Sequence, residues 1–214
     1  MATVSYAQKV DLYSIANFGK YEKQNKEYVQ SGKTPKVLLY GNSITEGWAK
    51  LRPTFFESNN FLGRGIGGQT SAQLLMRFQQ DVVALKPKTV IINIGINDIA
   101  ENTGTYNEQF TFDNIKSMAQ LAKANGIRVI LSSVLSINKI GWNKEVTEVG
   151  EKVKSLNALI EQYARKNGWK YIDYYNTELN DGNGGLKAEY APDFVHPNEK
   201  GYEIMEAVVM RNVK

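Results

Sequence analysis

The sequence contains no cysteine and only one histidine among its 214 residues. The lack of cysteine excludes thiol nucleophiles, disulfide bonds and cysteine metal ligands together. It leaves the cellular compartment open, because cytosolic and secreted proteins can both lack cysteine. One histidine and scattered acidic residues do not supply the ligand cluster of a zinc hydrolase. We therefore expect a protein without a bound metal.

Long apolar stretches are absent as well. No run approaches the roughly 20 residues that a membrane-spanning helix needs. The N-terminal stretch MATVSYAQKVDL lacks the apolar centre of about 7–15 residues that a signal peptide requires. We therefore expect either a cytoplasmic protein or a periplasmic or secreted one whose signal peptide has been removed. The sequence does not separate these two.

No region concentrates charge of one sign. The 26 Lys and Arg residues and the 22 Asp and Glu residues are interleaved, and the formal net charge is +4. There is no polybasic run of the kind that binds nucleic acid or a lipid surface, so we expect neither partner. A hydrophobic content of 42% with 22% charged residues is typical of a globular chain. The length predicts a single domain that covers residues 1–214.

Strand-like and helix-like patterns alternate along this domain. Apolar, strand-like segments occur at residues 37–40, 61–62, 89–94, 129–131 and 169–173. Helical patterns occur at residues 43–57, 71–78, 108–124, 146–166 and 199–213. This alternation predicts an α/β fold in which a five-stranded parallel sheet carries helices on both faces, a three-layer α/β/α arrangement.

Residues 1–35 precede this core, which occupies residues 36–213. Aromatic and apolar residues recur at near-helical spacing between Tyr13 and Tyr28. They predict a helix that packs as a brace against the outside of the domain. The alternative role for this segment is a contact between two copies of the chain in a homodimer.

Residues that could take part in catalysis follow four of the five predicted strands. They are Ser43 after the first strand, Gly65–Gly68 after the second, Asn97–Asp98 after the third, and Asp193–His196 after the fifth strand and its loop. The carboxyl ends of parallel strands lie at one edge of a sheet, where ligands bind. We therefore expect these four stretches to form one cleft. For Ser43, a helix cap is the purely structural alternative.

Together these residues fit acyl transfer through a serine nucleophile. A serine hydroxyl is a weak nucleophile until a base takes its proton, and His196 is the one imidazole available. Asp193 can accept the Nδ1–H of that ring and hold its orientation. An oxyanion would be met by the Ser43 backbone N–H, a glycine N–H and the Asn97 side-chain amide.

Four motifs then resemble the four blocks of the SGNH hydrolases, also called GDSL-like esterases. They are GNSIT at 41–45, GIGGQT at 65–70, GIND at 95–98 and DFVHPN at 193–198, in the family order. The resemblance spans residues 36–210. It is strongest to the bacterial branch that is similar to platelet-activating-factor acetylhydrolase subunits and carbohydrate acetylesterases.

This resemblance implies a flavodoxin-like fold and a role for each matched residue. Ser43 would be the nucleophile, His196 the base, and Asp193 the residue that orients the base. The oxyanion hole would consist of Ser43, Gly68 and Asn97, with Gly67 as the near neighbour of the matched glycine. No cofactor or metal would be needed.

The motifs depart from the family pattern at three positions. Asn42 stands where the family commonly has Asp, Gln69 replaces another common Asp, and Phe194 replaces a common Gly. These changes leave every catalytic group in place. They bear on the rate and on the shape of the acyl pocket.

The candidate substrate-binding residues are Asn42, Trp48 and Trp142. The two tryptophans, together with Tyr106, could stack on a sugar at the rim of the cleft, although packing is the commoner role of such side chains. The loops 132–144 and 174–192 would select the alcohol part of the substrate.

The expected function is hydrolysis of short O-acyl esters, above all O-acetyl groups on a carbohydrate, through an acyl-enzyme. The alternatives are a lipase-, lysophospholipase- or thioesterase-like hydrolase and, from another class, a non-catalytic carbohydrate-binding module on the same fold. The run Gly63–Gly68 also matches the dinucleotide fingerprint GxGxxG. However, this run follows the second strand, and Asp81 does not end a strand as the ribose-binding acid should.

Overall fold

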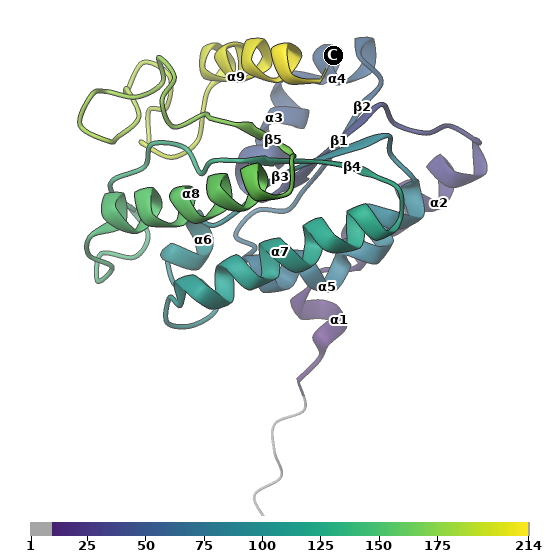
Figure 1. Ribbon diagram of the computed structural model, residues 1–214, viewed down its shortest axis with the longest axis horizontal. Helices are drawn as coiled ribbons and strands as arrows, with labels where there is room; N and C mark the ends of the chain where they lie inside the picture. Colours follow the sequence, from purple (N-terminus) through teal and green to yellow (C-terminus); the bar gives the residue numbers. More distant parts are fainter. Residues whose placement is uncertain (1–9, 214) are drawn as a thin grey trace, which may run out of the picture.

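Five parallel strands form one sheet in the order β2-β1-β3-β4-β5 (Figure 1). The computed structural model describes residues 10–213. Its strands are β1 (Val37–Gly41), β2 (Phe61–Gly65), β3 (Thr89–Asn93), β4 (Arg128–Ser132) and β5 (Lys170–Ile172). All four neighbouring pairs are parallel. This strand order is that of the flavodoxin-like folds, so the predicted α/β architecture is confirmed.

Two interior strands, β1 and β3, correspond to the continuous apolar runs in the sequence. Every residue of β1 and β3 is buried, as expected for strands that are covered by helices on both faces. The register pairs Gly41 with Gly65 on one side and with Asn93 on the other. The segments that follow these three strands therefore leave the sheet at the same level.

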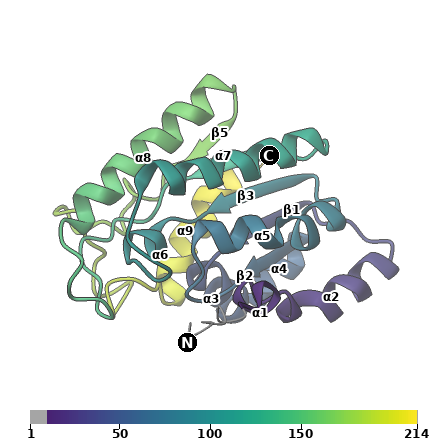
Figure 2. The same ribbon diagram turned by 90° about the horizontal axis from the view of Figure 1, so that it is seen from below.

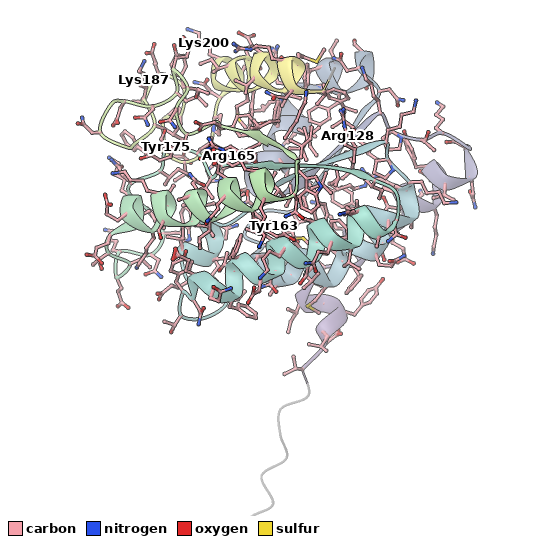
Figure 3. The ribbon with its side chains drawn as sticks, viewed as in Figure 1. Arg128, Tyr163, Arg165, Tyr175, Lys187 and Lys200 are labelled. Carbon is pink, nitrogen blue, oxygen red and sulfur yellow. The ribbon has the colours of Figure 1, made fainter. Side chains whose placement is uncertain are left out.

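Helices cover both faces of the sheet (Figures 1 and 2). One layer holds α3 (Ser43–Leu51), α4 (Pro53–Ser58) and α9 (Glu199–Asn212). The other layer holds α5 (Ser71–Asp81), α7 (Glu108–Ala124) and α8 (Val149–Lys166). Two short elements, η1 (Val83–Leu85) and α6 (Ile96–Ile99), complete the core. Tyr163 of α8 lies beside α7 (Figure 3), edge to face with Phe112 at a centroid distance of 5.8 Å.

The predicted helix at 43–57 is in fact two helices. It ends at Leu51 and restarts at Pro53 as α4. Proline lacks a backbone N–H and therefore suits the first turn of a helix but not its interior. The segment 146–166 also begins later than predicted, at Val149.

The predicted N-terminal brace is two helices as well, α1 (Leu12–Ile15) and α2 (Gly19–Gln30). Asn17 separates them with a left-handed φ of 53°, a conformation that asparagine adopts more readily than most residues. Both helices lie on the side of the sheet that carries α5 (Figure 2). Residues 1–9, which include the start of the predicted brace and most of the N-terminal stretch MATVSYAQKVDL, lie outside the described residues.

Across residues 10–213, no helix combines the length and the apolar character that crossing a membrane would demand.

Candidate active site

Ser43 lies at the first position of α3, directly beyond the end of β1. The side chain of Asn42 caps the helix, since its Oδ1 accepts the Ile44 N–H at 3.2 Å. The turn also packs closely against the end of β2. A Cβ on Gly65 would collide with the backbone atoms Glu46 N and Asn42 O, so this position requires a glycine.

Ser43, His196 and Asp193 form a continuous hydrogen-bonded chain. Ser43 Oγ lies 2.8 Å from His196 Nε2, although the two residues are 153 positions apart in the sequence. His196 Nδ1 lies 2.6 Å from Asp193 Oδ2. The sequence placed these three residues in one cleft, and the structure brings them into hydrogen-bond contact.

The environment of Asp193 keeps it ionised. Burial acts to raise the pKa of this carboxyl, but hydrogen bonds from the backbone and ring of His196 and from the Val195 N–H outweigh it, and the pKa of Asp193 is lowered from 3.8. An ionised Asp193 accepts the Nδ1–H of His196. The Nε2 atom is then left without a proton and can accept one from the Ser43 hydroxyl.

A pocket of about 310 Å³ opens at this chain of residues. Its described lining consists of Ser43, Gly68, Asn97, Asn102, Trp142 and His196. The residues come from segments that follow β1, β2, β3, β4 and β5. The four predicted stretches therefore do meet at the carboxyl edge of the sheet.

The structure distinguishes between the two neighbouring glycines. The Gly67 N–H donates to Glu46 Oε2 at 2.7 Å. The Gly68 N–H has no hydrogen-bond acceptor among residues 10–213, and Gly68 lines the pocket with a φ of 75°. Gly68 is therefore the glycine whose N–H can meet a ligand.

Asn97 and Asp98 follow β3 but have different surroundings. The Asn97 side chain reaches the pocket and donates one N–H to the carbonyl of Gln69 at 2.9 Å. Asp98 is buried and accepts the Ser71 N–H at 3.0 Å, at the start of α5. Burial raises the pKa of Asp98 to about 6 in spite of the hydrogen bonds from Ser71 and Thr111.

Two of the three predicted substrate-binding residues do not line the pocket. Trp48 is only 2% exposed and stacks on Tyr202 at a centroid distance of 5.6 Å, so the predicted position at the rim is wrong. Asn42 is 1% exposed, and its side chain caps α3 and does not face the pocket. Tyr106 packs against the hydrophobic core and is not part of the pocket lining.

Trp142 does line the pocket, together with a residue that the sequence did not suggest. That residue is Asn102. Trp142 Nε1 donates to Asn102 Oδ1 at 2.9 Å, and Asn102 Nδ2 donates to the carbonyl of Gly68 at 2.9 Å. The Trp142 side chain stays 48% exposed. Asn102 belongs to no motif, so only the tertiary contact reveals it. The 132–144 loop thus reaches the pocket, whereas the lining includes no residue of 174–192.

Other features of the described residues offer no comparable chemistry. A larger hollow of about 520 Å³ lies between the end of β5 and α9, but its lining includes neither serine nor histidine. No group of three or more potential metal ligands occurs within residues 10–213. Asp81, which a dinucleotide site would need as its ribose-binding acid, is buried in α5 and paired with Arg77.

Known proteins resemble this chain in fold and in sequence. A solved structure from Bacteroides fragilis NCTC 9343 has a TM-score of 0.89 and 45% identity, covering 96% of this chain and 98% of that chain. An acetylxylan esterase from Xylanibacter ruminicola is 26% identical over 84% of this chain but only 43% of its own length, so this chain spans less than half of that relative. An isoamyl acetate-hydrolyzing esterase 1 homolog from Bos taurus is 28% identical over 80% of this chain and 78% of its own.

The family assignment follows from a match that covers most of the chain. The model of the GDSL-like Lipase/Acylhydrolase family matches residues 39–204. That range includes all four motifs from GNSIT to DFVHPN, and the resemblance to SGNH hydrolases is thereby confirmed. This protein belongs to the GDSL-like lipase/acylhydrolase family.

Proposed function

We propose that this protein is a serine esterase that removes short O-acyl groups, above all O-acetyl groups, from a carbohydrate. The observation that carries the proposal is the Ser43–His196–Asp193 chain, with contacts of 2.8 and 2.6 Å, at the mouth of a pocket. A nucleophile, a base and an orienting acid in hydrogen-bond contact are the arrangement that acyl transfer requires.

The reaction would proceed in two halves. Ser43 Oγ attacks the ester carbonyl while His196 Nε2 takes its proton, and the tetrahedral intermediate then expels the alcohol, which receives that proton from His196. This leaves the acyl group on Ser43. A water molecule then attacks the acyl-enzyme with His196 as base, and release of the carboxylic acid restores the Ser43 hydroxyl.

The negative oxygen of each intermediate needs hydrogen-bond donors. We assign this role to the backbone N–H groups of Ser43 and Gly68 and to the Asn97 side-chain amide. Ser43 begins α3, where backbone N–H groups lack partners within the helix. The remaining N–H of Asn97 is available because its contact with Gln69 uses only one of the two.

Two kinds of support favour an acetyl ester of a sugar. The names of an acetylxylan esterase and an isoamyl acetate-hydrolyzing esterase homolog, both similar to this chain, share the acetyl group although their alcohols differ. The exposed Trp142 at the pocket supplies an aromatic face, and such faces stack well on sugar rings. A carbohydrate alcohol is therefore the substrate class to test first.

The first experiment measures hydrolysis of p-nitrophenyl acetate, butyrate and octanoate by the wild-type protein and by Ser43→Ala. Ser155→Ala serves as the control, because Ser155 is exposed on α8. We expect turnover that falls steeply with acyl length and disappears only in Ser43→Ala. Turnover that rises with acyl length would replace the proposal with a lipase- or thioesterase-like activity.

A second experiment tests the alcohol. Acetate release from acetylated xylo-oligosaccharides is compared with release from isoamyl acetate at equal ester concentration. A higher kcat/KM on the acetylated sugar supports a carbohydrate esterase, and a higher value on isoamyl acetate contradicts it. Binding of the sugar without serine-dependent release of acetate from any ester would point to a non-catalytic carbohydrate-binding module.

A further inference from the structure

Gln69 links the two pocket groups that we assign to the oxyanion. It directly follows Gly68, and its carbonyl accepts the Asn97 side-chain N–H at 2.9 Å. The side chain of Gln69 is turned away from solvent, with the residue only 3% exposed. The orientation of Gln69 therefore affects both the Gly68 N–H and the Asn97 amide.

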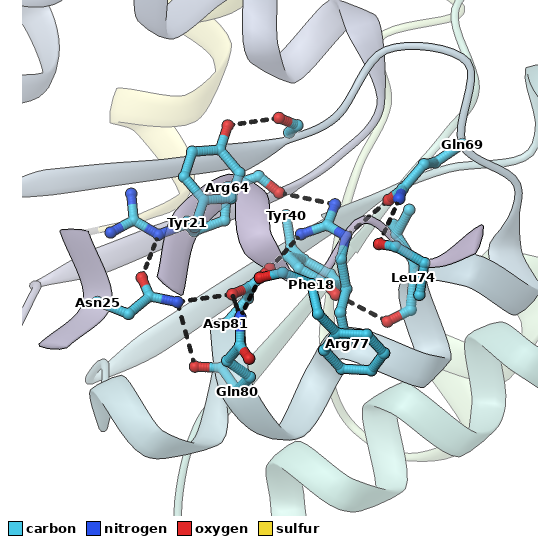
Figure 4. A network of polar contacts seen from close by, with 12 residues as sticks. Phe18, Tyr21, Asn25, Tyr40, Arg64, Gln69, Leu74, Arg77, Gln80 and Asp81 are labelled. Atoms are coloured by element: carbon cyan, nitrogen blue, oxygen red, sulfur yellow. Dashed lines mark hydrogen bonds and ion pairs between the residues drawn. The ribbon is translucent and has the colours of Figure 1, made fainter. Parts of the chain in front are cut away.

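Arg77 of α5 holds the Gln69 side chain from inside the protein (Figure 4). Its Nε donates to Gln69 Oε1 at 2.6 Å, and its Nη2 donates to the carbonyls of Gly41 and Arg64 at 3.1 Å each. Gly41 is the last residue of β1, shortly before Ser43. One planar guanidinium thus connects the strand end that carries the nucleophile with the loop that carries Gly68.

The charge of Arg77 is fully buried and well compensated. Arg77 has no exposed surface, and its Nη1 pairs with Asp81 Oδ2 at 2.8 Å. Its guanidinium also lies over the Tyr40 ring at 4.5 Å from the centroid. A buried ion pair adds little net stability compared with apolar residues of similar volume. Its hydrogen bonds to the segments around the active site give it another role, that of holding them in place.

The N-terminal segment completes this support. Gln69 Nε2 donates to the carbonyl of Ala16 at 2.7 Å, between α1 and α2. Tyr21 of α2 donates its hydroxyl to the carbonyl of Gly65, at the other end of the same loop. The loop from Gly65 to Gln69 is therefore attached to the N-terminal segment at both ends.

We propose that Gln69 and Arg77 are positioning residues for the oxyanion donors Gly68 and Asn97, and that the N-terminal segment contributes to this positioning through the Ala16 carbonyl. The inference rests on the proposed esterase function for the role of the donors. The network itself exists in the free protein and can be tested without catalysis. The segment predicted as an outer brace thereby becomes part of the active-site support.

The kinetic test compares Gln69→Met, Gln69→Glu and Arg77→Lys with the control Gln80→Met. Gln80 lies on α5, like Arg77, and donates to the Phe18 carbonyl at 2.8 Å and to Asp81 Oδ1 at 3.2 Å, but it makes no hydrogen bond to Gln69, Arg77 or the loop. We expect Gln69→Met to lower kcat about tenfold with KM changed less than about twofold. Displaced donors stabilise the transition state less, whereas substrate binding does not depend on them. Arg77→Lys should lower kcat in the same way, because a lysine ammonium cannot reproduce the fixed set of guanidinium hydrogen bonds, whereas Gln80→Met should keep the wild-type kcat.

The variant Gln69→Glu separates the two halves of the network. Its carboxylate can still accept a hydrogen bond from Arg77, but it can no longer donate one to the Ala16 carbonyl. We expect kcat between those of the wild type and Gln69→Met. A kcat in Gln69→Met equal to that of Gln80→Met, at equal midpoint of thermal unfolding, would overturn the proposal.

An NMR measurement keeps the inference independent of the esterase assignment. In Arg77→Lys, and in Gln69→Met or, if the methionine variant does not fold, in Gln69→Glu, the Gly68 backbone N–H and Asn97 side-chain N–H resonances should shift. In Gln80→Met they should stay unchanged. Unchanged Asn97 side-chain resonances in both Gln69 variants, or an unchanged Gly68 N–H resonance in Arg77→Lys, would refute the positioning role. A wild-type protein without Ser43-dependent turnover would instead refute the proposed function, with the NMR result still deciding the network.

Discussion

Both carboxylate oxygens of Asp193 contact His196. Oδ2 lies 2.6 Å from the ring atom Nδ1, while Oδ1 accepts the His196 backbone N–H at 2.7 Å. Oδ1 also accepts the Val195 N–H at 3.0 Å. Phe194, between the two partners, takes a left-handed φ of 64°. The tight turn thus holds the base and its orienting acid in a fixed relative position through contacts that do not involve Ser43.

Replacing this carboxylate should impair the base and leave the turn in place. In Asp193→Asn the amide oxygen can still accept a backbone N–H. However, the uncharged amide no longer stabilises the imidazolium and no longer holds the neutral ring in the tautomer that is protonated at Nδ1. We expect kcat for p-nitrophenyl acetate to fall about 10⁴-fold. The control is Asp173→Asn, at the end of β5 and outside the pocket. A loss under about tenfold would remove Asp193 from this role.

Asn97→Ala should remove one donor to the oxyanion. We expect kcat to fall by about 10²–10³ with KM little changed, because the donor acts mainly in the transition state. The control is Asn114→Ala, since Asn114 is also a buried amide but donates to Ser71 Oγ and not into the pocket. A decrease under tenfold would show that Asn97 is not an oxyanion donor.

Trp142→Ala should discriminate between substrates. We expect KM for acetylated xylo-oligosaccharides to rise about tenfold, while p-nitrophenyl acetate changes less, because only the sugar needs the stacking surface. Trp142→Phe keeps an aromatic face and should retain most of the sugar affinity. Equal changes on both substrates would mean that Trp142 shapes the pocket without recognising the sugar.

Asp98 should make the stability of the protein depend on pH. Its pKa is raised to about 6 from 3.8 by burial, so the folded chain binds this proton more tightly than the unfolded chain. The protonated carboxyl therefore favours folding. This contribution is complete below the unfolded pKa and is lost as the pH rises through the folded pKa.

The isosteric variant Asp98→Asn isolates this effect, because it carries no titrating proton. The free energy of unfolding of the wild type minus that of the variant should fall by about 3 kcal/mol between about pH 3.5 and about pH 7. Urea denaturation at several pH values measures this difference. Asp113→Asn is the control, since hydrogen bonding to Lys116 lowers the pKa of the Asp113 carboxyl and gives the opposite slope. A difference for Asp98 that is independent of pH would contradict the expectation.

Local sequence patterns were enough to predict the sheet and the helices that cover it. The runs Val37–Tyr40 and Thr89–Ile94 are apolar throughout because central strands are buried on both faces. The strand β2 was harder to delimit. It extends to Gly65, although its last residues include glycines, because pairing with β1 holds them in the sheet. The break between α1 and α2 depends on the backbone of Asn17, which no periodicity reveals.

The sequence by itself determined the fold class and the residues that can carry the chemistry. Only one histidine is present, and each motif follows a strand, so the parallel topology brings them to one edge. The tertiary structure alone decided which tryptophan faces the pocket. Trp48 is covered by Tyr202 of α9, from the far end of the chain, whereas Trp142 is held at the pocket by Asn102. Burial and support of a side chain depend on such distant partners, and spacing along the chain does not encode them.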